Sequence, residues 1–223
     1  MTILFAYIAD NQAAIASDGN IVRNSDDTII NNKTDKTFSL YNAKIVGAFS
    51  NNMGIDHKRY GKEVSIGTII GEITKGIQEP DDLGLFVNTL INLYEELLNS
   101  ADTKLPSITE RTSNILLAGS RNFDNKDYEI HWVHFGYSEE RQIIRKKNCY
   151  CVSGNGAWYV APPEDEKPQI TRAIQCFFSH IPPNLTPSQL ARKAIQIGIK
   201  SSTIMKANEK FLGGEIFVRT TSY

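Results

Sequence analysis

Short apolar runs separated by turn-forming residues characterise the beginning of the chain. Residues 2–9 (TILFAYIA) and 12–18 (QAAIASD) are rich in apolar side chains, which is typical of strands. Asp10 and Asn11 lie between them, and these residue types tolerate the positive φ that a two-residue hairpin turn requires. The pattern predicts a strand pair, followed by a polar loop over residues 19–35.

A second pair of apolar, β-branched runs occupies residues 37–41 (TFSLY) and 44–50 (KIVGAFS). Asn42 and Ala43 separate these runs and are compatible with a turn. We therefore expect a second hairpin, and then a polar, irregular stretch over residues 51–64.

Apolar residues recur at spacings of three and four in the next part of the chain. Residues 65–77 (SIGTIIGEITKGI) and 81–101 (DDLGLFVNTLINLYEELLNSA) both have this helical period. Asp81 and Asp82 are suited to cap the second helix, because Asp is a preferred N-cap residue.

Strand-like and helical segments alternate in blocks over the rest of the chain. Three strands are predicted at 114–119, 128–136 and about 141–152. Two helices follow, at about 168–180 and from the segment TPSQ, in which Thr186 caps, Pro187 begins the first turn and Gln189 completes a capping box. The segment GGEIFVRTT then predicts a closing strand.

The order of these elements is strands, helices, strands, helices and one strand. It is neither the βαβ alternation of a doubly wound sheet nor an all-β sandwich. An α+β sandwich of four layers, αββα, with two antiparallel sheets between two outer helical layers, buries every apolar face. Because no repeat, low-complexity tract or linker divides the sequence, residues 1–223 are expected to form a single domain.

Charge and hydropathy exclude several classes of partner. The chain has 24 Lys and Arg residues against 25 Asp and Glu residues, a net charge of -1, which gives no electrostatic reason to expect nucleic acid or an anionic membrane. No basic segment precedes the first apolar run, and no run approaches the roughly 20 residues of a membrane span. We therefore expect a cytoplasmic protein.

The cysteine and histidine residues do not predict a metal site or a cofactor. Cys149, Cys151 and Cys176 are an odd number and too few for a disulfide framework, so buried structural thiols are expected. His131 and His134 are three apart in one predicted strand, so they point to opposite faces and cannot share a metal ion.

The register of the first hairpin brings candidate chemistry together. If Ala9 lies opposite Gln12, paired positions sum to 21, so Thr2 lies opposite Gly19 and beside Asp18. The start of the chain and a carboxylate then meet at one end of the sheet.

Lys36 can join Thr2 and Asp18, because it stands at the entry of the second hairpin. A Thr hydroxyl needs a base, and the α-amine of an N-terminal Thr, with a pKa near about 8, can serve once Met1 is removed. A lysine ammonium would lower the pKa of both groups, and an aspartate would hold the lysine. The alternative is an ordinary structural ion pair near the strand ends.

The residues that carry this chemistry resemble the proteasome β subunits and their bacterial peptidase relatives, within the N-terminal nucleophile hydrolases. The resemblance lies in TILFAYIADNQAAIASDGN and DKTFSLYNAKIVGAFS, and more loosely in VSGNGAWYVA and GGEIFV. It implies a proteasome-β-like αββα fold and a threonine-type peptidase. It also implies that Thr2 is nucleophile and base, that Lys36 is its electrostatic partner and that Asp18 holds the lysine.

Further site residues follow only from the resemblance, with departures from the family pattern. Asn51 stands in place of the Gly whose backbone N–H is the oxyanion donor. Asn155 in SGNG replaces the serine that supports the amine of the nucleophile, with Ser153 as the substitute if the register slips, and Glu209 replaces an Asp. Phe49 is expected to line a substrate pocket.

Three functions remain open at this point. The first is hydrolysis of peptides or unfolded proteins, without a cofactor, in a homo-oligomeric ring that encloses the sites. The second is a non-catalytic ring subunit, because Asn51, Asn155 and Glu209 replace other residues. The third is a small-molecule amidase on the same fold. The sequence leaves open whether an unfolding ATPase serves the particle.

Overall fold

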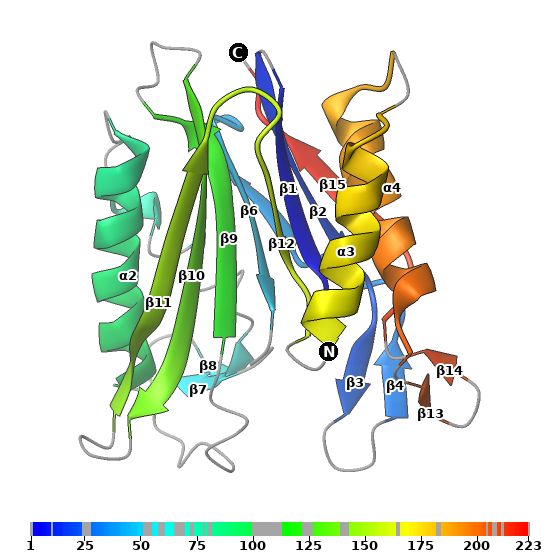
Figure 1. Cartoon of the computed structure of the whole chain (residues 1–223). Coiled ribbons are helices and arrows are strands. Elements are labelled where there is room, and N and C mark those ends of the chain that lie inside the picture. Colours follow the sequence, from blue (N-terminus) through cyan, green and yellow to red (C-terminus); the bar gives the residue numbers. More distant parts are fainter. Residues whose placement is uncertain are drawn as a thin grey trace.

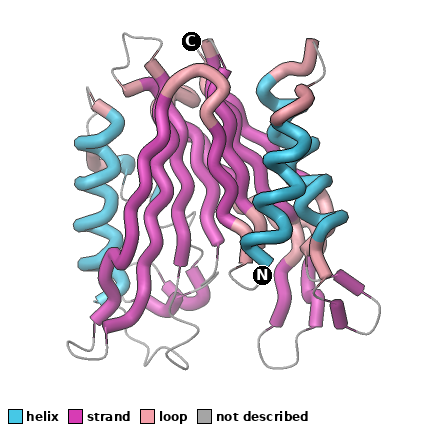
Figure 2. Tube along the Cα trace, in the orientation of Figure 1, coloured by secondary structure: helices cyan, strands magenta, loops and turns pink. Residues whose placement is uncertain are grey.

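The fold consists of two antiparallel sheets enclosed by helices, arranged in four layers (Figure 1). The structure is a computed structural model. It describes the chain apart from residues 1, 10, 24–27, 51–54, 58–60, 65–69, 72–73, 78, 80–81, 100–112, 122–126, 139–142, 164–165, 182–183, 204, 207–208, 211 and 223. Figure 2 shows the helices on the two outer sides and the strands between them. The predicted α+β sandwich is therefore confirmed.

The first sheet contains the first and the last of the described strands and has the strand order β12-β1-β2-β15. Its strands are β1 (Leu4–Ala9), β2 (Gln12–Asp18), β12 (Trp158–Ala161) and β15 (Ile216–Thr220). Ala9 pairs with Gln12 and Leu4 pairs with Ser17, so the predicted register of the first hairpin is confirmed.

The second sheet has the strand order β11-β10-β9-β6-β5. Its strands are β5 (Thr37–Leu40), β6 (Ile45–Ser50), β9 (Ser113–Ser120), β10 (Tyr128–Ser138) and β11 (Ile143–Ser153). The predicted turn between β5 and β6 is confirmed, because the Lys44 N–H donates to the Tyr41 oxygen at 3.1 Å. Asn42 and Ala43, between them, have φ of 54° and 64°.

Helices cover the outer face of each sheet (Figure 1). Helix α2 (Leu83–Asn99) covers the second sheet, while α3 (Lys167–Phe178) and α4 (Pro187–Ser201) cover the first. The Leu85 N–H donates to Asp82 Oδ1 at 2.8 Å, as expected of a cap. None of the helices in the described part of the chain is long and apolar enough to cross a membrane.

Alternation of side chains along the strands produces three layers of core. Ile45 and Phe49 of β6 pack toward α2, whereas Val46 and Ala48 of the same strand pack between the two sheets. The third cluster lies between the first sheet and helices α3 and α4, where Ile3 is fully buried. This two-sided burial explains why the strands read as continuous apolar runs.

Some short strands were not predicted. The expected loop 19–35 contains the hairpin β3 (Ile21–Arg23) and β4 (Thr28–Asn31), and the expected irregular stretch 51–64 contains β7 (Ile55–His57) and β8 (Gly61–Val64). Strands of three or four residues are too short to show a period of two against polar neighbours. In the predicted helix 65–77, residues 70–71 and 74–75 are helical, and residues 65–69 and 72–73 lie outside the described part.

The capping box of α4 is formed as predicted. The Gln189 N–H donates to Thr186 Oγ1 at 3.3 Å, and the Thr186 N–H donates to Gln189 Oε1 at 2.9 Å. We expect Thr186→Ala to lower the free energy of unfolding by about 1 kcal/mol, because the Gln189 N–H loses its side-chain acceptor. Urea unfolding would measure this loss. Thr186→Ser keeps the oxygen and should lose much less, and equal losses would contradict the capping explanation.

Candidate active site

The first hairpin brings Asp18 to the start of the chain. Below the last ladder pair, the Ile3 N–H donates to Asp18 Oδ1 at 3.0 Å, and the Asp18 N–H donates to the Ile3 oxygen at 3.4 Å. The Asp18 side chain is fully buried, and Thr2 is 9% exposed. The hairpin register thus fixes a buried carboxylate beside the hydroxyl of Thr2.

Lys36 joins Thr2 and Asp18 from the entry of β5. Its Nζ donates to Thr2 Oγ1 at 2.7 Å and to the Asn20 backbone oxygen at 2.7 Å, and it lies 3.4 Å from Asp18 Oδ1. These contacts occupy all three donor positions of an ammonium group. The side chain is only 1% exposed, so the structure brings together the three residues that the sequence predicted.

Burial dominates the electrostatics of this group. Removal from water lowers the pKa of Lys36, and the nearby Asp18 carboxylate only partly opposes this. The same removal raises the pKa of Asp18, against the attraction of Lys36 and the amides of Ile3 and Gly213. The proton on Lys36 is therefore held less tightly than on an exposed lysine, while the Thr2 hydroxyl accepts its hydrogen bond.

A glycine turn from the far end of the sequence supports Asp18. The Gly213 N–H donates to Asp18 Oδ2 at 3.3 Å, and the Gly213 oxygen accepts the N–H groups of Gly19 and Asn20 at 3.0 and 3.1 Å. Asn20 and Gly213 were not predicted as site residues. Their contributions come from backbone atoms, so the only signal in the sequence was the Gly pair itself.

Gly214 is required at this turn for two reasons. Its φ is +78°, and a Cβ atom would lie 2.3 Å from the Asn32 oxygen and 2.6 Å from Asn20 Oδ1. We expect Gly214→Ala to lower the free energy of unfolding by about 1–3 kcal/mol, because both the strain and the backbone clash oppose it. Thermal unfolding would measure this. Gly154, with φ of +97° and open space at its Cβ, is the control for strain alone, and Gly154→Ala should cost less.

The predicted roles of Asn51 and Glu209 stay predictions. Asn51 lies outside the described residues. The backbone of Glu209 lies in strand β14 (Glu209–Lys210), which pairs with β13 (Met205–Lys206). Figure 1 shows this pair at the end of the molecule where the chain begins.

Asn155 lies at the other end of β1 from Thr2, which contradicts its predicted contact with the amine. The Gly156 N–H donates to the Ile8 oxygen at 2.9 Å, and Asn155 and Ser153 line a cavity of about 360 Å³ together with Ile8. Positions 2 and 8 are six steps apart along the chain, which is roughly 20 Å when the chain is extended. The cause is β12: SGNG leads into this strand, which returns along β1 until Ala161 pairs with Leu4.

The position of Phe49 gives no support to the predicted substrate contact. Its side chain is 4% exposed and belongs to the core cluster beneath α2. Alternation along β6 turns Val46 and Ala48 the other way, into the space between the sheets. Phe49 is thus a packing residue on the face of β6 that is covered by a helix.

Known proteins resemble this chain in its fold. The sequence matches no protein-family model and no curated protein. Solved structures nevertheless resemble it over nearly its whole length. BPH from Thiobacillus denitrificans has a TM-score of 0.53 and 14% identity, covering 98% of this chain and 97% of that chain.

Two further solved structures have the same arrangement. Eukaryotic HslV from Trypanosoma brucei has a TM-score of 0.51 and 11% identity, and all of each chain is covered. Anbu (ancestral beta-subunit) from Yersinia bercovieri has a TM-score of 0.56 and 12% identity, covering 98% of this chain and 81% of that chain. The predicted resemblance is therefore confirmed at the level of the fold: this chain has the αββα architecture of the proteasome-like N-terminal nucleophile hydrolases.

Proposed function

We propose that the protein is a threonine-type peptidase whose nucleophile, Thr2, is exposed by removal of Met1. The observation that carries this proposal is the 2.7 Å contact between Lys36 Nζ and Thr2 Oγ1, in a site where the lysine is 1% exposed and Asp18 is fully buried. Burying an ion pair is expensive, and replacing such a pair by apolar side chains often costs no stability, so its presence beside the Thr2 hydroxyl favours a role in chemistry.

The proposed reaction uses the α-amine of Thr2 as general base. It takes the proton from Oγ1 as this oxygen attacks the carbonyl carbon of an amide, and it then delivers the proton to the leaving amine. The Lys36 ammonium lies where negative charge develops on Oγ1, so it lowers the cost of forming the alkoxide. Water, activated by the same amine, hydrolyses the ester formed at Thr2 and restores the hydroxyl.

Asp18 acts on this reaction through Lys36. Its carboxylate is held by the Ile3 and Gly213 amides and lies 3.4 Å from Nζ, so it favours the charged form of the lysine in a site that otherwise disfavours charge. We assign Asp18 the role of a positioning residue. Asn51 and Glu209 remain proposed members of the site, the first through its backbone N–H.

One observation favours an alternative, a ring subunit without activity. Asn155 does not reach the chain start, so the support that it was expected to give to the amine must come from elsewhere or is lacking. A small-molecule amidase is the third candidate and differs from the first in substrate only. The assembled group of Thr2, Lys36 and Asp18 favours catalysis over a scaffold.

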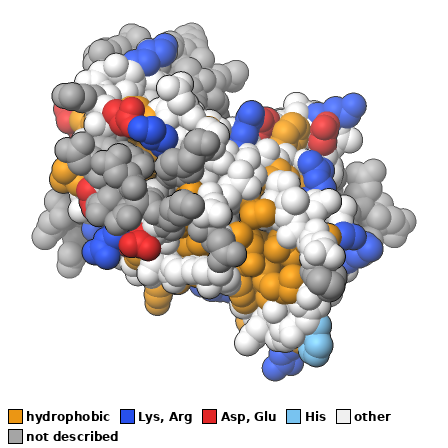
Figure 3. Space-filling model, turned by 90° about the horizontal axis from the view of Figure 1, so that it is seen from above, with side chains coloured by type: hydrophobic (Ala, Val, Ile, Leu, Met, Phe, Trp, Pro, Cys, Tyr) orange, Lys and Arg blue, Asp and Glu red, His pale blue; other side chains and the backbone are white. Residues whose placement is uncertain are grey.

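We further propose that the protein assembles into a closed homo-oligomeric ring with inward-facing sites, acting on peptides or unfolded proteins in the cytoplasm. Figure 3 shows hydrophobic side chains gathered in a group on one face. Leu85, Tyr150 and Ile181 are 62%, 60% and 40% exposed, and they are suited to contacts between copies. A closed ring would limit the entry of protein substrates to the sites. An ATPase that unfolds these substrates is therefore a proposed partner.

The intact mass of the native chain, before and after treatment with epoxomicin, tests the proposal. BPH from Thiobacillus denitrificans has been solved in complex with this compound. The expected result is a chain without Met1 that gains one epoxomicin molecule, attached at Thr2. Retained Met1 would contradict the proposal, because the base would be blocked as an amide. A processed chain that assembles but gains no adduct would favour the inactive subunit.

A further inference from the structure

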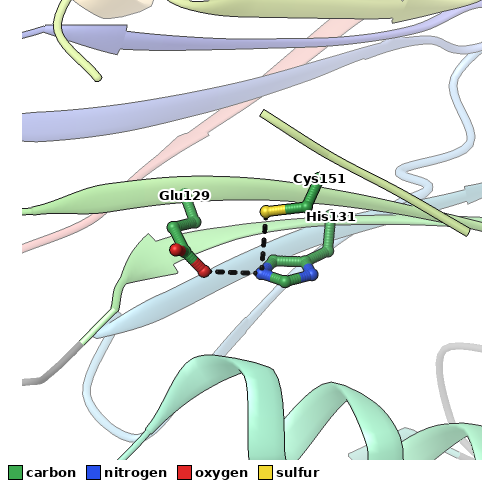
Figure 4. Close-up of side chains that lie close together, drawn as sticks. All are labelled: Glu129, His131 and Cys151. Atoms are coloured by element: carbon green, nitrogen blue, oxygen red, sulfur yellow. Dashed lines mark hydrogen bonds and ion pairs between the residues drawn. The ribbon is translucent and has the colours of Figure 1, made fainter. Parts of the chain in front are cut away.

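Three possible metal ligands converge on the second sheet, away from the chain start. Glu129 and His131 lie two apart on β10, and Cys151 is paired with His131 across the β10–β11 ladder. All three side chains point to the face of the sheet that packs against α2, and Figure 4 shows their ligand atoms gathered at one point. Within the described residues, these atoms lie within 4.8 Å of one another.

The distances are near those of a tetrahedral zinc site. Cys151 Sγ lies 3.6 Å from His131 Nε2, and Glu129 Oε2 lies 2.9 Å from the same nitrogen. In a tetrahedral zinc site the Zn–S bond is about 2.3 Å and the Zn–N bond is about 2.0–2.1 Å, so a sulfur and a nitrogen ligand lie about 3.6 Å apart. A nitrogen and an oxygen ligand lie about 3.4 Å apart. The sulfur–nitrogen distance already fits, and the oxygen–nitrogen distance must lengthen for one ion to contact both atoms.

The same geometry argues against a cysteine nucleophile. In a catalytic triad the nucleophile and the orienting carboxylate contact opposite nitrogens of the imidazole, so that the proton can pass through the ring. Here the sulfur and the carboxylate both approach Nε2. Burial and the neighbouring Glu129 carboxylate also raise the pKa of Cys151 to about 11, so without a metal ion its thiol is a weak nucleophile, and Zn²⁺ must displace the thiol proton when it binds.

We propose that Glu129, His131 and Cys151 form a mononuclear zinc site that links β10 to β11. A thiolate and a carboxylate together balance the charge of Zn²⁺, and a ligand set of S, N and O suits zinc better than calcium or magnesium. Cys151 is exposed, whereas the side chains of Glu129 and His131 are 12% and 10% exposed, so an ion can enter from solvent and water can fill the fourth position. Arg121 Nε lies 3.5 Å from Glu129 Oε1, which leaves Oε2 for the metal.

The sequence does not predict this site, because its residues become neighbours only when two strands pair. His131 was compared with His134, which lies on the opposite face and contacts Asn114. Cys151, by contrast, is 20 residues away and reaches His131 only through the register of β10 and β11. The expectation that the cysteines are buried is also wrong, since all three are exposed.

Titration of the full-length, reduced protein with Zn²⁺, against a chromogenic chelator, tests the proposal. We expect one ion per chain, and we expect Co²⁺ in its place to give the intense thiolate-to-metal absorption of a cysteine ligand. Cys151→Ser and His131→Gln should each weaken Zn²⁺ binding by at least about 100-fold, and Glu129→Gln by at least about 10-fold. Zn²⁺ should also slow alkylation of Cys151 by iodoacetamide, but not that of Cys176.

Matched variants separate this site from adventitious binding. Cys176→Ser removes another exposed thiol, and His134→Gln removes a histidine on the other face of β10, and both should bind Zn²⁺ as the native chain does. A native chain that binds no Zn²⁺, or Cys151→Ser that binds it undiminished, would overturn the proposal. Circular dichroism checks the fold of each variant. If a variant is unfolded, protection of Cys151 in the native chain decides the question.

Discussion

Replacing Thr2 by alanine is expected to lower the turnover of a fluorogenic peptide by at least about 1,000-fold, because no other group takes the place of the attacking oxygen. The α-amine and the Lys36–Asp18 pair both remain in this variant. The fold should also remain, since the change removes only one hydroxyl and one methyl group from a site that Ile3 and Gly213 hold through backbone hydrogen bonds.

The control for this prediction is Thr2→Ser, which keeps the hydroxyl near Lys36 Nζ. It should retain a measurable fraction of the turnover and should still react with epoxomicin. Turnover in Thr2→Ala at the native rate would exclude this residue as the nucleophile. Loss of assembly in Thr2→Ala would instead assign the hydroxyl a structural role, which gel filtration of both variants would reveal.

The second large effect concerns stability. Lys36→Met should lower the free energy of unfolding by about 3–5 kcal/mol, because it leaves the buried Asp18 carboxylate without its cation. The Asn20 oxygen also loses the donor that lies 2.7 Å from it. Urea unfolding of the native chain and the variant would measure the difference.

A double-mutant cycle separates the charge from the packing at this position. Asp18→Asn combined with Lys36→Met removes both charges, so the double variant should be more stable than Lys36→Met alone by several kcal/mol. Additive losses in the two single variants would mean that the two groups do not interact in the folded state. The double variant should have no peptidase activity, whatever its stability, because the cation beside Thr2 is gone.

Residues tied to a regular strand register could be predicted from the sequence. The side-chain period of two and a two-residue turn together determine every pairing of β1 with β2, and this alone placed Thr2 beside Asp18. Lys36 followed because it stands one residue before β5. The positions of these three residues depend on the type of turn and on the alternation of side chains along a strand. A short stretch of sequence is enough to predict both.

Residues that depend on distant pairing could not be predicted. Gly213 reaches Asp18 across 195 positions, and only the pairing of β15 with β2 brings them together. The predicted position of Asn155 is wrong because it rested on the resemblance alone, whereas β12, which was not among the predicted strands, returns along β1 and leaves SGNG at the far end of that strand. Cys151 and His131 are neighbours only through a ladder with a register shift between His134 and Phe135.

The support of Asp18 by Gly213 has a consequence for the order of events during synthesis. Residues 2–36 contain the hydroxyl, the carboxylate and the lysine and leave the ribosome well before Gly213, whose amide is translated 195 positions after Asp18. Since β15 must also join the edge of β2, the nascent chain has an unfinished site until most of its length is made. The proposed activity would therefore appear only after β15 has paired with β2.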